Sequence, residues 1–327
     1  MSLTRISNCP WRRRFSKILV ASVVLLIFAG GMVTSTGSGL AVPDWPLSYG
    51  MLFPPMVGGV LYEHGHRMIA SVIGLFTLIL AVWTALTETR SWVRKLAFLA
   101  LGAVIAQGIL GGVTVLFFLP KPISISHAVL AQTFFCLVIF YAYSQSLERA
   151  RRVEAADSLA SCSQKRSAVL LAIVIYFQLL LGAIMRHTGS GLAVPDFPTM
   201  GWGWSPIVTE GMLAKIDFWR FEHGLASVTV AQIYFHLLHR LGATFVLLAL
   251  GWFNVAWRAN KSVKRKQSLW LINFAVVAQV ILGVLTVWTG KASIVTSFHV
   301  VNGAICLGLT VLAVLRVYPT TCKKASS

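Results

Sequence analysis

The chain contains the eleven-residue stretch Thr36-Gly-Ser-Gly-Leu-Ala-Val-Pro-Asp-Trp-Pro46, which recurs as Thr188-Gly-Ser-Gly-Leu-Ala-Val-Pro-Asp-Phe-Pro198 with one difference. Further along, Ala106-Gln-Gly-Ile-Leu-Gly-Gly-Val-Thr114 is matched by Ala278-Gln-Val-Ile-Leu-Gly-Val-Leu-Thr286, and Gln178-Leu-Leu-Leu-Gly182 has the same pattern. Chance does not produce identity at this level. The sequence therefore predicts two related units in tandem.

Long apolar runs surround these repeated stretches. Of the 327 residues, 57% are hydrophobic and only 12% are charged, and the mean hydropathy is +0.76. A soluble domain carries about 25% charged residues, so a water-soluble globule is excluded. Segments of ~10 residues with alternating polarity, which a transmembrane β-barrel needs, do not occur. We predict membrane-spanning helices at 17–36, 63–86, 96–118, 125–146, 167–187, 233–256, 268–288 and 294–315.

The repeat divides these spans into two sets of four. We therefore expect an all-α membrane protein with eight transmembrane helices, arranged as two tandem four-helix bundles related by a pseudo-two-fold axis along the membrane normal. The predicted segments are an N-terminal segment 1–16, a first unit 17–150, a linker 151–166, a second unit 167–315 and a tail 316–327.

The second unit has the longer first outer loop. The offset between matched residues grows from 152 at the first motif to 172 or 173 later, which places about 21 extra residues between Met200 and Gln232. This stretch is rich in Trp and Phe, which favour the membrane–water boundary. We expect a short amphipathic piece on the outer membrane surface.

Basic residues predict the orientation. The formal net charge is +18, but the Lys and Arg residues cluster in short segments between apolar runs, at 5–17, 90–95, 149–166, 258–266 and 316–324. This is the pattern of orientation signals, so nucleic-acid binding is not expected, and both termini are predicted to be cytoplasmic. The first span could be a cleaved signal peptide, but its counterpart in the second unit is internal, which favours a permanent helix. No predicted outer loop contains a cysteine.

Four of the eight histidines fall at matched positions of the two units. His66 in the second span corresponds to His239 in the sixth, and His127 in the fourth span corresponds to His299 in the eighth, with spacings of 61 and 60 residues within each pair. Ionisable groups at membrane depth are costly and mark functional sites more often than packing contacts. Paired histidines on facing helices favour axial ligation of a haem iron over zinc or copper, which need three or four ligands at one point.

Glu63 distinguishes the two units, because the matching position holds His236. Glu63 and His66 are three residues apart and project from the same helix face, so a carboxylate would stand beside the first haem. An acid at one site alone suits an enzyme in which one haem is the substrate. The alternative is that Glu63 pairs with Arg67 or lies among the headgroups. Arg67 and Arg240, each next to a ligand histidine, suit either the binding of haem propionates or snorkelling to the interface.

The remaining histidines carry weaker signals. His64 is two residues from His66 and points to a different face of the helix, while His187 and His223 fall at the interface or in the long loop. We expect these three side chains to be solvated or interfacial.

Several motifs together point to a known family: Glu63-His-Gly-His66-Arg67, Thr36-Gly-Ser-Gly with Asp44-Trp-Pro46, and single histidines opening the fourth and eighth spans. On these residues the chain resembles the haem A synthase family (CtaA/Cox15) over about residues 17–315. The resemblance implies an oxidoreductase that oxidises the C8 methyl group of haem O to the formyl group of haem A for cytochrome oxidase assembly.

The resemblance also implies roles for individual residues. The first unit would hold the substrate haem through His66 and His127, the second would hold a haem b through His239 and His299, and Glu63 would serve the reaction. One feature departs from the family, because many bacterial members carry a cysteine pair in the first outer loop. This chain has Val42 and Ser48 there, and Val194 and Met200 in the second unit, so no such disulfide can act here.

Converting a methyl to a formyl group removes four electrons, most simply by two successive hydroxylations and loss of water from a geminal diol. The expected partners are the lipid bilayer, haem O delivered by a haem O synthase and an unidentified electron acceptor, with a homo-oligomer left open. The expected location is the bacterial plasma membrane, or the mitochondrial inner membrane in a eukaryote.

Two other classes of protein would account for part of this pattern. A dihaem b-type cytochrome that oxidises a quinol explains the four histidines equally well, but it does not explain why His236 replaces Glu63 in the second unit. A transporter built on a parallel repeat predicts broken helices or charged residues near mid-membrane, whereas the polar residues of this chain cluster at the outer ends of the spans.

Overall fold

The computed structural model describes residues 9–154, 160–259 and 262–318. Parts of the predicted N-terminal segment, linker and tail therefore lie outside the described residues. Within the described ranges, eight helices are long and apolar enough to cross a membrane, and each coincides with one predicted span. They are α2 (Pro10–Ser35), α3 (Gly59–Thr87), α4 (Ser91–Leu116), α5 (Lys121–Ser144), α7 (Cys162–His187), α9 (Val230–Trp257), α10 (Val263–Trp288) and α11 (Ser293–Val317).

The helices begin up to seven residues before the apolar runs that predicted them, and polar caps start two of them. At the start of α7, the Ser161 hydroxyl accepts a hydrogen bond from the Gln164 N–H, and the Gln164 side chain accepts one from the Ser161 N–H. This capping box satisfies donors that a helix N-terminus otherwise leaves unpaired. Thr229 and Gln232 form the same box at α9. Hydropathy alone does not register such polar first turns.

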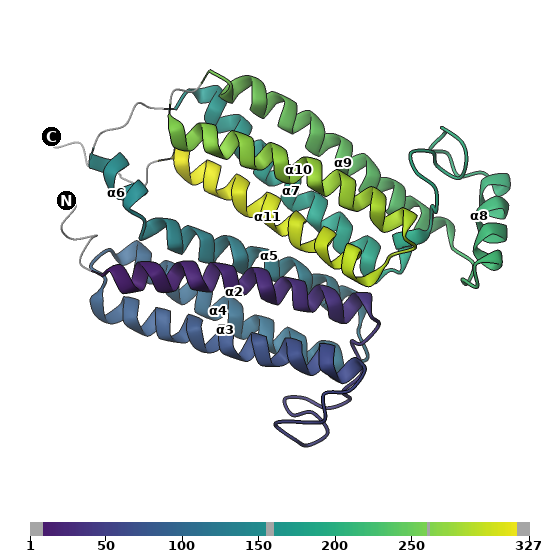
Figure 1. Cartoon of the computed structure of the whole chain (residues 1–327), viewed down its shortest axis with the longest axis horizontal. Coiled ribbons are helices and arrows are strands. Elements are labelled where there is room, and N and C mark those ends of the chain that lie inside the picture. Colours follow the sequence, from purple (N-terminus) through teal and green to yellow (C-terminus); the bar gives the residue numbers. More distant parts are fainter. Residues whose placement is uncertain (1–8, 155–159, 260–261, 319–327) are drawn as a thin grey trace.

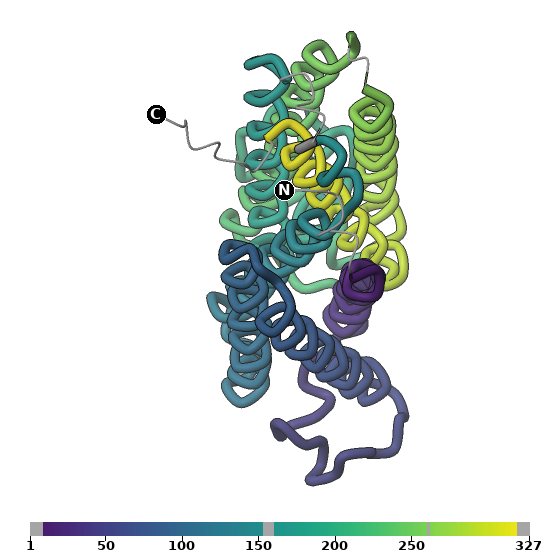
Figure 2. Tube along the Cα trace, turned by 90° about the vertical axis from the view of Figure 1, so that its left-hand side faces the viewer, coloured from purple at the N-terminus to yellow at the C-terminus, as the bar shows by residue number. Residues whose placement is uncertain are grey.

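The long helices form two groups, α2 to α5 and α7 with α9 to α11 (Figure 1). Each group surrounds a hydrophobic core of its own. Helix α11 joins the groups, because it packs against α2 and α5 as well as α7 and α10. Its Ala304 belongs to the first core and its Leu307 to the second. Figure 2 shows the helices of the two groups crossing at an angle.

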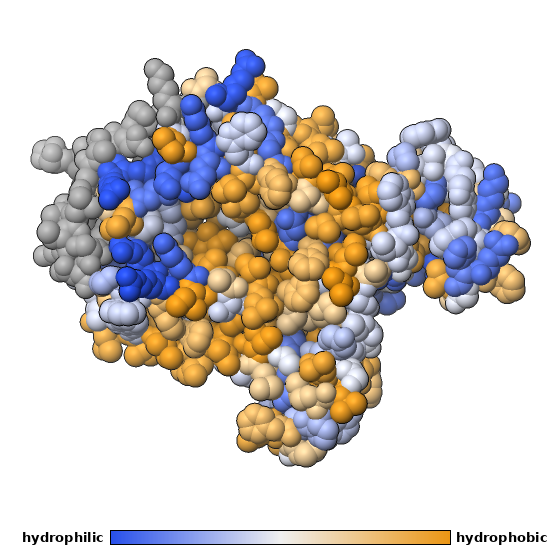
Figure 3. All heavy atoms as spheres, viewed as in Figure 1, coloured by the Kyte–Doolittle hydropathy of each residue, from blue (hydrophilic) through white to orange (hydrophobic). Residues whose placement is uncertain are grey.

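Helix α2 begins at the end of the molecule where helix α11 ends, and hydrophilic residues gather there (Figures 1 and 3). Buried ion pairs hold this end together. Glu88 binds Arg12 and Arg90 with O–N distances of 2.8 Å, and Arg316 binds both carboxylate oxygens of Glu148 at 2.8 and 2.9 Å. Burial alone would raise the pKa of Glu88, but hydrogen bonds from Arg90 and the charges of Arg90 and Arg12 lower it to about 2.

The long second-unit loop contains a helix, α8 (Glu210–Glu222), within the stretch for which the sequence predicts a short amphipathic piece. Met212 and Ile216 of α8 pack with Val194 and with Ile233 and Leu237 of α9. Figure 1 shows α8 projecting beyond the ends of the long helices, at the end of the molecule where α2 ends and α3 begins. Phe218 and Phe221 on its other side are exposed.

Candidate functional site

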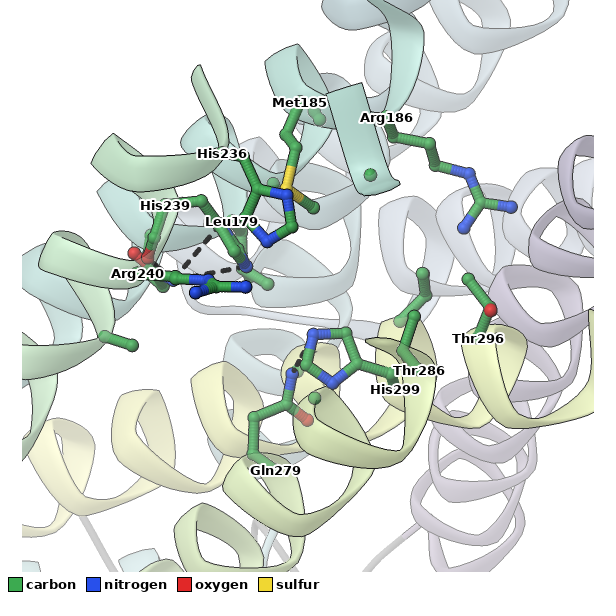
Figure 4. A pocket seen from close by; sticks show the side chains of 18 of the residues that line it. Leu179, Met185, Arg186, His236, His239, Arg240, Gln279, Thr286, Thr296 and His299 are labelled. Carbon is green, nitrogen blue, oxygen red and sulfur yellow. Dashed lines mark hydrogen bonds between the residues drawn. The ribbon is translucent and has the colours of Figure 1, made fainter. Parts of the chain in front are cut away.

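The four matched histidines lie on four different helices. His66 is on α3, His127 on α5, His239 on α9 and His299 on α11, each near the end that bears the outer loops. Figure 4 shows His239 and His299 projecting into one cavity from facing helices. Their ring centroids are 6.4 Å apart, with the rings at 71° to each other. One metal ion bound at ~2 Å by a nitrogen of each ring would separate the centroids by roughly this distance.

Each of these four histidines lies over a glycine of the neighbouring helix. A Cβ atom added to Gly30 would stand 3.0 Å from Cε1 of His66, and one added to Gly182 would stand 3.2 Å from Cε1 of His239. Gly111 and Gly283 have the same relation to His127 and His299, at 3.5 and 3.1 Å. The missing side chains let each imidazole pack close to the adjoining backbone. The repeat matches Gly30 with Gly182 and Gly111 with Gly283, and in the structure each of these glycines leaves room for a histidine ring.

A glutamine one turn before the glycine contacts three of the four histidines. Gln107 and Gln178 each donate from Nε2 to the backbone carbonyl of their histidine, His127 and His239, at 2.9 Å. Gln279 lies on the matching turn of α10, with its Nε2 3.3 Å from Nε2 of His299. Helix α2 departs from this pattern, because Leu26 occupies the corresponding turn before Gly30. His66 is therefore the one member of the four without a glutamine contact in the described structure.

Buried ring nitrogens without a partner suit histidines that bind a ligand carrying a metal ion. The Nδ1 atoms of His66, His127 and His299 are buried without a hydrogen-bond partner among the described residues. A buried polar atom in this state is costly unless a ligand completes it. The described ranges contain no cluster of three or more His, Cys, Asp or Glu side chains suited to a bare metal ion. Two histidines per site therefore fit a haem, whose ring supplies the other ligands.

The cavity between His239 and His299 has a volume of about 670 Å³. Its described lining includes three cationic side chains, Arg186, Arg240 and Lys291, and no carboxylate. Arg186 donates to the Gly31 carbonyl at 2.7 Å and thereby links the second group of helices to α2. An apolar cavity of this size with cations at its edge suits a flat apolar ligand that carries carboxylates.

Arg67 and Arg240 hold the outer loops that follow α2 and α7. Arg67 donates to the carbonyls of Asp44 and Leu47 at 2.7 and 2.9 Å, and Arg240 donates to those of Asp196 and Thr199 at 2.6 and 2.8 Å. These carbonyls are matched by the repeat. Arg240 also lines the cavity, so its side chain can meet a ligand while it holds the loop.

The aspartate of each repeated loop closes a turn. Asp44 accepts hydrogen bonds from the N–H groups of Gly50 and Tyr49, which lower its pKa. Asp196 accepts the equivalent bonds from Gly201 and Trp202, both at 2.8 Å. The repeated sequence thus produces the same local hydrogen bonding in both outer loops.

Glu63 is 4% exposed and both of its carboxylate oxygens are bonded. Oε2 accepts the Val42 N–H at 2.9 Å, and Oε1 lies 2.5 Å from Nη2 of Arg67. In the second unit, Nδ1 of His236 accepts the Val194 N–H at 3.3 Å. The pairing of Glu63 with Arg67 was one of the two alternatives that the sequence allowed, and it leaves the proposed chemical role of the carboxylate open to experiment.

The other three histidines lie in different surroundings. The expectation of a solvated His64 is wrong, because this side chain is 6% exposed and its Nδ1 lies 2.8 Å from Oγ of Ser48. The first outer loop folds back over the start of α3 and covers it, which helix periodicity cannot reveal. His187 is half-buried and lines the cavity, and His223 is exposed and stacks on Trp219.

Sequence reasoning missed several residues of the site. Gln107, Gln279 and Gln178 stood within the repeated motifs but were not connected to the histidines, although their recurrence was a usable signal. No such signal existed for Arg186, because Thr34 occupies the corresponding position of the first unit.

The fold and the site define a polytopic helical membrane protein with two pairs of intramembrane histidines suited to haem iron. Residues 56–311 match the family described as cytochrome oxidase assembly protein (COX15-CtaA). Because the match spans more than half of the chain, the protein belongs to that family, as the sequence motifs predicted.

Named relatives extend over almost the whole chain. This chain is 27% identical over 311 residues to the haem A synthase of Lysinibacillus sphaericus, and the match covers 93% of this chain and 94% of the relative. The haem A synthase of Shouchella clausii is 27% identical over 300 residues, covering 88% and 90%. That of Halalkalibacterium halodurans is 26% identical over 297 residues, covering 87% and 90%.

Proposed function

We propose that this protein is a haem A synthase, an oxidoreductase that converts the C8 methyl group of haem O to the formyl group of haem A. The observation that carries the proposal is the pair of duplicated histidine sites, each with imidazoles over glycines and buried nitrogens that lack a protein partner. The full-length similarity to relatives named haem A synthase supports the same activity.

The two sites take different haems in this proposal. His66 and His127 hold the substrate, and His239 and His299 hold a resident haem b. The residues of the second site fit such a group, since the cavity supplies two facing imidazoles and three cations for propionates. When bound, a haem b supplies one-electron redox chemistry near the substrate. Gln178 and Gln279 orient its ligands, and Arg240 anchors the loop that covers this end.

Glu63 is the proposed catalytic residue of the first site. It lies one helical turn from His66 on the same helix face, and its carboxylate is held by Val42 and Arg67. A fixed carboxylate stabilises positive charge that develops on the methyl carbon, or accepts a proton from it. His236 offers no equivalent anion in the second site. This difference supports placing the chemistry in the first unit.

The remaining features of the proposal concern the cell. The bacterial relatives support the plasma membrane, with both termini cytoplasmic by the distribution of basic residues. With water as the source of the formyl oxygen, the four electrons pass to an acceptor outside this chain, and a haem O synthase delivers the substrate.

Haem extraction from the purified protein tests the proposal. Chromatography with mass detection should find haem O or haem A together with haem B. Haem B alone, in cells that also make haem O, would overturn the proposal and leave an electron-transferring b-type cytochrome.

A further inference from the structure

A second cavity, of about 810 Å³, lies between the two groups of helices at the end opposite the histidines. Helices α2, α5 and α11 and the short helix α6 (Leu147–Glu154) contribute to its lining. It shares no lining residue with the cavity between His239 and His299. The proposed reaction therefore does not account for it.

The rim of this cavity, which lies towards the helix ends, is strongly basic. Six cationic side chains and one carboxylate line it among the described residues, a balance of five positive charges: Arg13, Lys17, Arg151, Arg152, Lys264 and Arg316 against Glu148. The Glu148 carboxylate is already held by Nε and Nη2 of Arg316. No described carboxylate pairs with Arg13, Lys17 or Arg151. Arg13, Lys17 and Arg151 thus present positive charge that no carboxylate among the described residues compensates.

The inner part is apolar. Ile305, Leu309 and Leu312 follow one face of α11, and Phe135 and Ile139 line the cavity from α5. At the bottom, α5 and α11 approach so closely that a Cβ atom on Gly308 would stand 2.7 Å from Cδ1 of Ile139. Phe135 precedes the last residue of α5 by nine positions, which is about 13 Å along a helix axis. The cavity therefore runs from a charged rim well into the hydrophobic layer.

We propose that this cavity binds one anionic phospholipid, with its phosphate among Arg13, Lys17 and Arg151 and an acyl chain along the apolar faces of α5 and α11. Basic pockets between transmembrane helices bind anionic headgroups. A free phosphate would use the rim and leave the apolar depth unfilled. A neutral lipid would leave the rim charges uncompensated. The anionic lipid matches both parts and contacts both groups of helices.

The test uses the full chain, stripped of lipid in detergent, and native mass spectrometry during titration with phosphatidylglycerol or phosphatidylcholine. The double variant Arg13→Gln/Lys17→Gln removes two rim charges. The matched control Arg94→Gln/Lys95→Gln removes one Arg and one Lys from exposed positions at the same end that do not line the cavity. Because each charge near the headgroup contributes ~1 kcal/mol, the cavity variant should bind phosphatidylglycerol roughly 10- to 30-fold more weakly, and the control should change by less than about twofold.

Two further arms separate the sources of phosphate and guard against misfolding. Inorganic phosphate and the chain-free headgroup glycerophosphoglycerol should compete poorly with the lipid. Arg151→Gln, a single change on α6, should weaken phosphatidylglycerol binding roughly fivefold even if the double variant proves unstable. Equal losses in the cavity and control variants, equal binding of phosphatidylcholine, or full displacement by inorganic phosphate would each overturn the proposal.

Discussion

Glu63 and His236 accept the same hydrogen bond at matched positions of the two units. Glu63 binds the N–H of Val42, and His236 binds the N–H of Val194. Both side chains therefore secure an outer loop to the helix that bears a haem-ligand candidate. They differ in charge, and this is the difference that an experiment can use to separate a structural role from a chemical one.

Glu63→Gln should keep both haems and lose the product. The amide oxygen can still accept the Val42 N–H, and no iron ligand is removed, but the negative charge is gone. Haem A formation should fall by about 100-fold or more, with haem O or a hydroxylated intermediate retained. The control His236→Gln should change the haem composition little. A normal haem A yield from Glu63→Gln would reduce this residue to a partner for Arg67 and Val42.

Alanine substitutions of the four histidines should act in pairs. His66→Ala and His127→Ala should alter the spectrum of one haem, while His239→Ala and His299→Ala should alter that of the other, because each iron loses one of two axial ligands. Reduced-minus-oxidised spectra of the four variants measure this. If His66→Ala and His239→Ala changed the same haem band, the assignment of one pair to each unit would be wrong.

The glutamine contacts should set how tightly each haem is held. Gln178→Leu removes the group that binds the His239 carbonyl and approaches its ring, so haem loss from the second site should accelerate by about 10-fold or more. Leu26→Gln supplies the missing glutamine near His66 and should slow haem loss from the first site. Transfer of haem to an excess of apomyoglobin gives both rates.

Gln132→Leu is the matched control for that experiment. Gln132 lines the same cavity from α5, but its Oε1 has no hydrogen-bond partner in the described structure, and it contacts neither ligand histidine by hydrogen bond. It should leave the haem dissociation rates nearly unchanged. A comparable acceleration in Gln132→Leu would show that cavity polarity, rather than histidine orientation, controls retention.

The Glu88 ion pairs should make stability depend on pH. The pKa of Glu88 is about 2 when folded and ~4.3 in an unfolded chain, so the folded state binds fewer protons. Its contribution is complete above the unfolded value and is lost as the pH falls towards 2. Glu88→Gln should cost about 3 kcal/mol at pH 7.

Thermal unfolding in detergent at pH 7, 5 and 3 would follow this effect. The difference between the wild type and Glu88→Gln should be constant from pH 7 to 5 and shrink at pH 3. A difference that grew on acidification would have the wrong sign for a carboxylate with a lowered pKa.

The orientation prediction is tested by reporter fusions. A reporter placed after Lys266 should read as cytoplasmic, and one placed in the loop near Glu210 should read as external, because loops rich in Lys and Arg remain inside. The opposite pattern would invert the map of the chain in the membrane.

The amino-acid sequence by itself determined the eight membrane helices and the four histidine positions. Each span must be apolar for about 20 residues to cross a bilayer, so hydropathy located the eight spanning helices, with starts up to seven residues late. The duplication sorted His66, His127, His239 and His299 from the other histidines, because a repeated ionisable group in an apolar segment is hard to explain by packing alone.

Tertiary structure decided which groups meet. The contacts of Gln178 with His239 and of Arg186 with Gly31 join residues 61 and 155 positions apart, and they depend on how neighbouring helices are rotated and how closely they pack. The burial of His64 and the use of Arg67 as a loop clamp depend on an outer loop that folds back over α3. Local periodicity carries no information on such contacts, since it specifies which face of a helix is apolar but not which helix that face will meet.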